Sequence, residues 1–146
     1  MSVPADASDA PTYERPTGVD DATVEAVGKV TEALEKVERA RGHLYDFHQL
    51  TGAADLALDE AVESLEKAGR SEWAERLRAE LVGRNVLAGR WTFQILDEYD
   101  AGYYRAFRDI EQAVRDDLVE GRRHVFEAEM KQARRTTGHP DHTAGP

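Results

Sequence analysis

Residues 24–50 decide the fold, and they read VEAVGKVTEALEKVERARGHLYDFHQL. The stretch holds no proline, and its large apolar residues return at intervals of three, four or seven positions: Val30, Leu34, Val37 and Leu44. An α-helix has about 3.6 residues per turn, so this spacing places them on one face. We therefore predict an amphipathic helix over residues 21–50, with Asp20 or Asp21 as its N-cap and Gly52 as its stop.

Outside this stretch, three more segments show helical spacing. The expected helices cover residues 54–68, 71–98 and 100–134. Gly69 ends the first, Ser71 caps the second and Asp100 caps the third. The last boundary has an alternative, because Gly102 could lie inside one continuous, kinked helix. No strand pattern occurs, and the short links place neighbouring helices antiparallel. The expected fold is all-α, an antiparallel four-helix bundle.

Both ends of the chain are expected to lie outside the folded domain. Residues 1–19 carry three of the five prolines and few large apolar side chains, and residues 136–146 read TTGHPDHTAGP. Such segments bury too little apolar surface to offset the chain entropy that is lost on ordering. We therefore predict one helical bundle domain over residues 20–135, between a disordered N-terminal tail and a disordered C-terminal tail.

The composition excludes several classes of function. The chain has no cysteine, so it forms no disulfide, iron–sulfur cluster or thiolate metal site. Its 29 acidic residues against 19 basic ones give a formal net charge of −10, which repels nucleic-acid phosphates. The N-terminus does not resemble a signal peptide, and no apolar run approaches the ~20 residues of a membrane span. We expect a cytoplasmic protein that binds neither nucleic acid nor membrane.

Two arginines interrupt the apolar stripes of the expected helices. Arg41 falls within about 20° of Val30 on the helical wheel, and Arg84 lies between Leu81 and Ala88. A buried guanidinium without a partner is strongly unfavourable, so each arginine must find a carboxylate or reach solvent. Either the pair lines an interior that binds an anion or another ligand, or each forms an internal ion pair. Four carboxylates are candidate partners: Asp55, Glu80, Glu98 and Asp117.

One end of the bundle gathers residues that could hold a metal ion. If the helices alternate in direction, five such residues come level there: His43, Asp46, His48, Glu98 and Tyr103. Histidine and carboxylate side chains bind divalent cations, and tyrosine serves as an outer hydrogen-bond donor. Against this, His43 and His48 point about 140° apart on one helix. The alternative is a core His48 that is hydrogen-bonded to a neighbour.

A second candidate ligand set lies near the C-terminal end of the last helix. Glu120, His124 and Glu127 stand at i, i+4 and i+7, with Asp117 at the edge of the apolar stripe. The alternative is a solvated, charged helix face. The Glu-x-x-His motif of ferritin-like di-iron proteins does not occur. We therefore expect no cofactor, while a single divalent metal ion stays open.

The sequence also suggests an interface with another chain. The candidate residues are Val82, Val86 and Phe93 on the second face of the helix over 71–98, and Arg108, Arg115, Arg122 and Phe126 along the helix over 100–134. A helix that is apolar on two faces is central to its fold or covered by another chain, and arginine beside aromatic rings is typical of interfaces. The alternatives are that the helix over 54–68 covers the first set and that the arginines form a solvated face.

No enzyme motif accompanies these features, because the chain has neither a Gly-rich phosphate loop nor a Gly-x-Ser-x-Gly elbow. The leading hypothesis is a non-enzymatic helical interaction protein that self-associates into a homo-oligomer through the helices over 71–98 and 100–134, or that binds a protein partner. The alternative hypothesis is a helical bundle that binds a metal ion or small ligand near His48.

Three segments resemble a small family of helical proteins from high-GC actinobacteria: GHLYDFHQLTG from Gly42, GRNVLAGRWTFQ from Gly83 and GRRHVFEAEMKQARRT from Gly121. The resemblance covers roughly residues 36–140. It carries over no catalytic residue, and it implies only a cytoplasmic bacterial protein.

Overall fold

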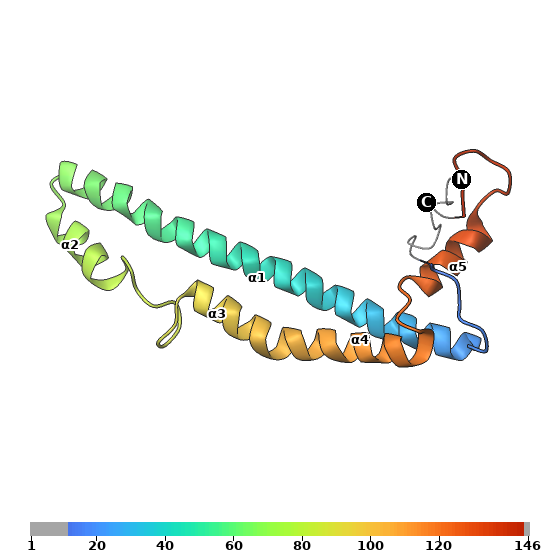
Figure 1. Cartoon of the computed structure of the whole chain (residues 1–146). Coiled ribbons are helices and arrows are strands. Elements are labelled where there is room, and N and C mark those ends of the chain that lie inside the picture. Colours follow the sequence, from blue (N-terminus) through green and yellow to red (C-terminus); the bar gives the residue numbers. More distant parts are fainter. Residues whose placement is uncertain (1–11, 145–146) are drawn as a thin grey trace, which may run out of the picture. The chain divides into compact units, whose positions relative to one another are not determined.

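The computed structural model describes residues 12–144, and this part of the chain is helical without a β-strand (Figure 1). The elements are α1 (Asp21–Lys67), α2 (Ser71–Glu80), α3 (Thr92–Tyr99), the π-helical segment η1 (Asp100–Tyr104), α4 (Arg105–Val119) and α5 (Val125–Arg134). The prediction of an all-α fold is confirmed. None of the helices within residues 12–144 has both the length and the apolarity that a bilayer crossing requires. The arrangement as an antiparallel four-helix bundle stays a prediction.

Helix α1 runs through Gly52, so the predicted stop at this glycine is wrong. Glycine inside a helix is less favourable than alanine by only about 1 kcal/mol, and Ala53, Ala54 and Ala57, which follow Gly52, favour continuation of the helix. The predicted N-cap is confirmed, because an Asp20 carboxylate oxygen accepts a hydrogen bond from the Thr23 amide at 2.8 Å. Hydrogen bonding with the side chain of Thr23, and next with its backbone amide, lowers the pKa of Asp20. The helix ends as predicted at Gly69, which has a φ of +73°.

The helix predicted over residues 71–98 is divided into α2 and α3. Two glycines, Gly83 and Gly89, have positive φ angles of 71° and 70°, a conformation that a right-handed helix cannot contain. Gly89 lies in a tight turn that is closed by an isolated bridge between Leu87 and Arg90. Ser71 is the first residue of α2 and makes no side-chain cap, so its predicted role as an N-cap is wrong.

From Thr92 to Val119 the chain is helical without a break, as the alternative for Gly102 foresaw, and Asp100 does not cap a separate helix. The π-helical segment η1 widens one turn and shifts the side chains that follow it around the axis. The predicted continuation to residue 134 is wrong. Glu120 and Gly121 take left-handed conformations with φ of 55° and 71°, and they end α4. Helix α5 starts after a third left-handed residue, His124.

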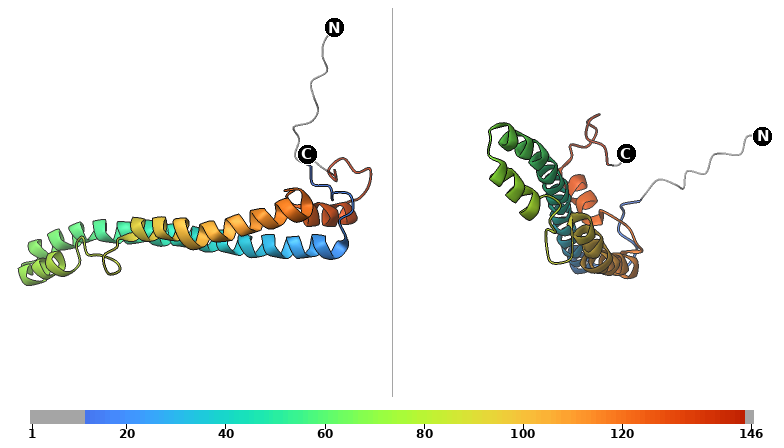
Figure 2. Two further views of the ribbon diagram at one scale, coloured as in Figure 1. Left: turned by 60° about the horizontal axis from the view of Figure 1, so that its bottom comes forward. Right: turned by 90° about the vertical axis from the view of Figure 1, so that its left-hand side faces the viewer.

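The chain divides into two compact units. The central unit is Lys36–Ala106. Its buried side chains come from α1, α2, α3 and η1: Val62, Ala74, Thr92, Leu96 and Tyr104. Helix α2 lies alongside the C-terminal part of α1 in every view (Figures 1 and 2). This contact is stabilised by an ion pair between Arg78 and Glu66. Just after α2, the Gly83 amide donates a hydrogen bond to the Asp55 carboxylate at 2.8 Å.

The terminal unit combines the first residues of the chain with the last, Met1–Glu35 with Phe107–Pro146. Its buried apolar side chains are Pro16 and four valines, Val24, Val27, Val119 and Val125. One carboxylate is buried among them. Glu111 accepts hydrogen bonds from Thr31 Oγ1 at 3.1 Å and from Arg115 Nε at 2.8 Å. The buried charge is thus paired with a guanidinium and hydrogen-bonded, as burial requires.

The predicted disordered tails fall largely outside the described residues, because residues 1–11 and 145–146 are not described. Residues 12–19, which the sequence analysis counted with the N-terminal tail, make ordered contacts with α5. The turns of residues 136–144 follow α5 directly.

Candidate interaction surfaces

The outer side of α1 in the central unit carries a long face without a carboxylate, lysine or arginine. We call it the α1 face, and it consists of His43, Phe47, Leu50, Ala54, Ala57, Ala61 and Leu65. These residues repeat every three or four positions, so they share one side over about 33 Å of helix. Leu50 is 69% exposed and Phe47 43% exposed. The residues of this face from His43 to Ala57 are exposed, and Ala61 and Leu65 are half-buried. In a chain of which 33% is charged, an uncharged face of this length is unusual.

The α1 face was not among the predicted surfaces, because the helix was expected to end at Gly52. Phe47 and Leu50 then belonged to one helix, and Ala54 and Ala57 to another. A helical wheel drawn without a break would have placed them on one side. The signal was therefore present, and the predicted stop concealed it.

Arg41 anchors a second candidate surface in the central unit. Its guanidinium donates hydrogen bonds to both carboxylate oxygens of Asp100, at 2.7 and 2.9 Å. The rings of Tyr45 and Tyr104 lie 4.9 and 4.7 Å from its central carbon, within the range of cation–π attraction. The predicted ion pair of Arg41 therefore forms, but with Asp100, which was not among the four expected partners. Hydrogen bonding to Asp100 raises the pKa of Arg41, and the pKa of Asp100 is lowered in return.

The π-helical turn supplies the aromatic part of this tyrosine–arginine cluster. Tyr104 is buried and donates its hydroxyl proton to the carboxylate of Glu38, with oxygen separations of 2.7 and 2.9 Å. Tyr99 lies between Tyr103 and Tyr104, with ring centroids 5.9 and 6.3 Å away. Burial raises the pKa of Tyr99. Tyrosine and arginine are frequent among the residues that contribute most of the binding energy in protein interfaces. Among Tyr99, Tyr103 and Tyr104, Tyr103 is the exposed side chain.

His48 packs as the alternative interpretation described. Its Nδ1 lies 2.7 Å from the hydroxyl of the buried Thr92. His43, Asp46 and Tyr103 are exposed, and Glu98 is occupied by a hydrogen bond from Arg90 at 3.1 Å. Within residues 12–144, no three His, Asp or Glu side chains stand close enough together to hold a metal ion. A metal site near His48 therefore stays a prediction without a preformed ligand set.

The second ligand set is separated by the break after α4. Asp117 stays on α4, Glu120 is hydrogen-bonded to Arg122 at 3.1 Å, and His124 precedes α5. His124 Nδ1 and Glu127 Oε1 are 3.9 Å apart, which is an ion-pair distance only when the imidazole is protonated. The even helical spacing on which this set depended does not exist in the structure.

The remaining predicted residues occupy varied positions. Arg84 is exposed in the turn after α2 and not on an interior stripe, because the helix ends before it. Of the interface candidates, Phe93, Phe126 and Arg108 are exposed, Val82 is at the edge of exposure, and Val86 is half-buried. Arg115 and Arg122 do not continue a surface stripe with Arg108. Arg115 is held by Glu111, and Arg122 donates to the Glu14 carbonyl at 2.7 Å.

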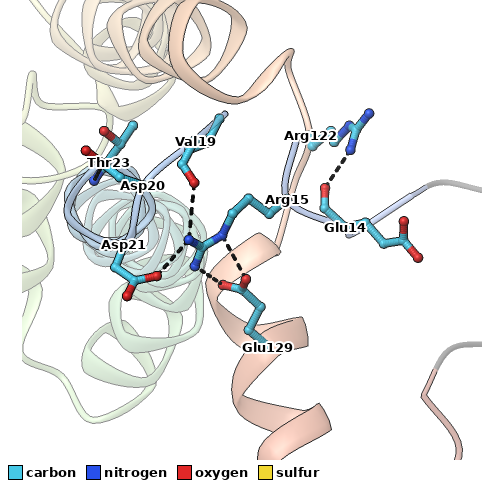
Figure 3. Close-up of polar contacts among 8 residues, drawn as sticks. All are labelled: Glu14, Arg15, Val19, Asp20, Asp21, Thr23, Arg122 and Glu129. Carbon is cyan, nitrogen blue, oxygen red and sulfur yellow. Dashed lines mark hydrogen bonds and ion pairs between the residues drawn. The ribbon is translucent and has the colours of Figure 1, made fainter. Parts of the chain in front are cut away.

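Arg15 organises a clasp in the terminal unit (Figure 3). It donates two hydrogen bonds to the carboxylate of Glu129 on α5, at 3.0 and 3.1 Å. It also donates to Asp21 at 2.7 Å and to the Val19 carbonyl at 3.2 Å. One guanidinium thus connects the start of α1 with α5. Composition could not reveal this contact, since 114 residues separate Arg15 from Glu129.

No family model matches the sequence. No curated protein and no solved structure shows significant similarity to it. The α1 face, the tyrosine–arginine cluster and the other surfaces of the chain are therefore the basis for a proposed function. The resemblance to an actinobacterial family stays a prediction.

Proposed function

We propose that the protein is a non-enzymatic helical interaction protein of the cytoplasm that self-associates through the α1 face. The single observation that carries the proposal is the exposure of Phe47 and Leu50 on a face without charged side chains. No catalytic residue is assigned.

Burial of this face favours association. Fully burying a leucine or phenylalanine side chain contributes roughly 1.5–3 kcal/mol. Between Leu50 and Leu65 the face carries the small side chains of Ala54, Ala57 and Ala61, which let a second helix approach closely. A face made of one helix can pair with the same face of a second copy across a two-fold axis. Each residue of the face is then buried in both copies.

Charge explains why a second copy is the preferred partner on this face. Two chains that each carry a net charge of −10 repel each other across most of their surfaces. An uncharged face is where that repulsion is weakest. In such a pair each copy would bring α1 and the α3 helix that is hydrogen-bonded to it through His48 and Thr92. The four-helix arrangement foreseen from the sequence is then proposed for the assembly.

Sedimentation velocity on wild type and two aspartate variants tests the proposal. Leu50→Asp places a charge on the α1 face, and we expect it to lower the mass of the assembly. Leu56→Asp is the matched control, because Leu56 is also 69% exposed on α1 but lies about 120° away around the helix. We expect the control to keep the wild-type mass. A wild type that sediments as a monomer at 100 µM, or equal effects of both variants, would overturn the proposal.

A further inference from the structure

Helix α4 in the terminal unit exposes apolar side chains beside carboxylates. Ile110 is 65% exposed, and Ala113 and Val114 follow it at helical spacing on the same side. Asp117 lies on this side, about 20° from Ile110 around the helix, and Asp109 borders it, about 40° beyond Ala113. Both carboxylates are exposed and form no side-chain hydrogen bond or ion pair with any residue within 12–144, and Val114 is half-buried. We call this surface the acidic α4 face.

Helix α5 carries a groove of the opposite charge. The groove has a volume of about 400 Å³ and is lined by Met130, Lys131, Arg134, Arg135, Asp141 and His142. Met130 is half-exposed and supplies its apolar floor. Arg135 is held by Gln132 at 2.7 Å and by the His142 carbonyl at 3.1 Å, so this wall is ordered. Lys131 and Arg134 are exposed and form no ion pair with any residue the structure describes.

We propose that the acidic α4 face of one copy docks into the basic α5 groove of a second copy. The two surfaces are alike, because each combines exposed hydrocarbon with two charged side chains that form no ion pair within the part of the chain that the structure describes, and their charges are opposite in sign. This inference rests on the proposed self-association and adds a second contact to it.

The proposed occupant is a second copy because both halves of the contact belong to the same chain. In a two-fold pair, α4 of each copy meets α5 of the other, and the contact is made twice. Pairing α4 with its own counterpart is disfavoured, because Asp117 lies on the face itself and two copies of the acidic α4 face would bring carboxylates together without a cation between them. Opposite charges on facing surfaces raise the association rate and suppress wrong partners.

The number of different contacts between copies determines the size of the assembly. The α1 face alone predicts a dimer. Two different contacts between copies predict an assembly larger than a dimer, because each chain then engages two neighbours. The α4–α5 contact is also the salt-sensitive one, since screening weakens exposed charge pairs and leaves apolar burial largely intact.

Charge reversal followed by mixing tests the pairing directly. One variant is Asp109→Lys with Asp117→Lys, and the other is Lys131→Glu with Arg134→Glu. Each reversal places like charges across the contact, and we expect the dissociation constant of this contact to rise about tenfold or more. Each variant alone should sediment as a dimer. An equimolar mixture should recover the wild-type mass, because lysines on one copy then face glutamates on the other.

Circular dichroism of each variant checks that the helices persist, and the mixture provides the second check, because only folded chains can restore the assembly. If wild type is a dimer, or if either variant keeps the wild-type mass, the α4–α5 pairing is overturned while self-association through the α1 face stands. If the mixture of variants stays dimeric, the pairing is likewise overturned. A monomeric wild type removes both proposals together.

Discussion

Arg41 and Asp100 form a two-pronged ion pair, in which Nε and Nη2 of the arginine donate to the two carboxylate oxygens at 2.7 and 2.9 Å. The side chains are 26% and 32% exposed, so the pair is partly withdrawn from water. It connects α1 to the π-helical turn in the central unit. Bidentate geometry and reduced solvation make such a pair worth more than an exposed one.

Removing the carboxylate should therefore destabilise the protein measurably. We expect Asp100→Asn to lower the free energy of unfolding by about 1 kcal/mol, since Arg41 would keep its tyrosine contacts but lose its counter-charge. Glu80→Gln is the matched control. Glu80 pairs with Arg76 at 3.0 Å, but both side chains are more than half exposed. Urea denaturation should show a change of only a few tenths of a kcal/mol for the control. Equal losses in the two variants would contradict the argument.

The same pair predicts a dependence of stability on pH. Arg41 lowers the pKa of Asp100 in the folded protein below its ordinary value. The unfolded state therefore binds the proton more tightly, and the ion pair stabilises the fold fully only above the unfolded pKa of about 3.9. This contribution is lost as the pH falls through the lower folded pKa. Urea denaturation of wild type and Asp100→Asn should give curves that differ at pH 6 and converge as the pH falls below about 4. A constant difference down to pH 2 would contradict the assignment.

Gly52 offers a test of the unbroken α1 helix. It lies inside the helix, and an added Cβ would have no atom within 4 Å other than those of its own turn. We expect Gly52→Ala to raise the free energy of unfolding by about 0.5–1 kcal/mol, because alanine has fewer unfolded conformations to lose. Gly69→Ala is a control for which the opposite change in stability is expected. Its φ of +73° strains any side chain, so this variant should be less stable than wild type. If Gly52→Ala were also destabilising, the helix would stop at Gly52 after all.

Arg15 should determine how firmly α5 is held in the terminal unit. Replacing it with alanine removes two hydrogen bonds to Glu129 and one to Asp21. We expect amide hydrogen exchange in residues 125–134 to accelerate several-fold, while exchange in the central unit stays unchanged. Arg123→Ala is the control, because Arg123 is exposed and its side chain forms no hydrogen bond or ion pair with the described residues. Unchanged exchange in Arg15→Ala would show that the clasp does not hold α5.

Much of the local structure was predictable from short-range patterns. Asp20 or Asp21 was expected as an N-cap, and Asp20 acts as one, because capping involves only the next three residues. Gly69 was expected to end a helix and does so with a left-handed conformation. The breaks at Gly83 and Gly121 were missed, since a glycine in the sequence does not reveal the sign of its φ angle. Gly52 and Gly102 stay helical, whereas Gly83 and Gly121 do not.

The contacts of the candidate sites were less predictable. The need of Arg41 for a carboxylate followed from desolvation, but the identity of the partner did not, because the π-helical turn at Asp100 alters the helical register. The choice for His48 was open between a metal ligand and a hydrogen-bonded core residue. Thr92, 44 positions away, supplies the hydrogen-bond partner.

By itself, the sequence determined the all-helical character, the start of the first helix at Asp20 and the lack of thiol chemistry. These features depend on periodicity, on neighbouring residues and on composition. Only the tertiary structure decided where helices break, that Arg41 meets Asp100, and that Arg15 meets Glu129. Such pairings depend on how distant segments pack, and several partners of equal chemistry compete for each charge until the backbone places one of them within hydrogen-bonding distance.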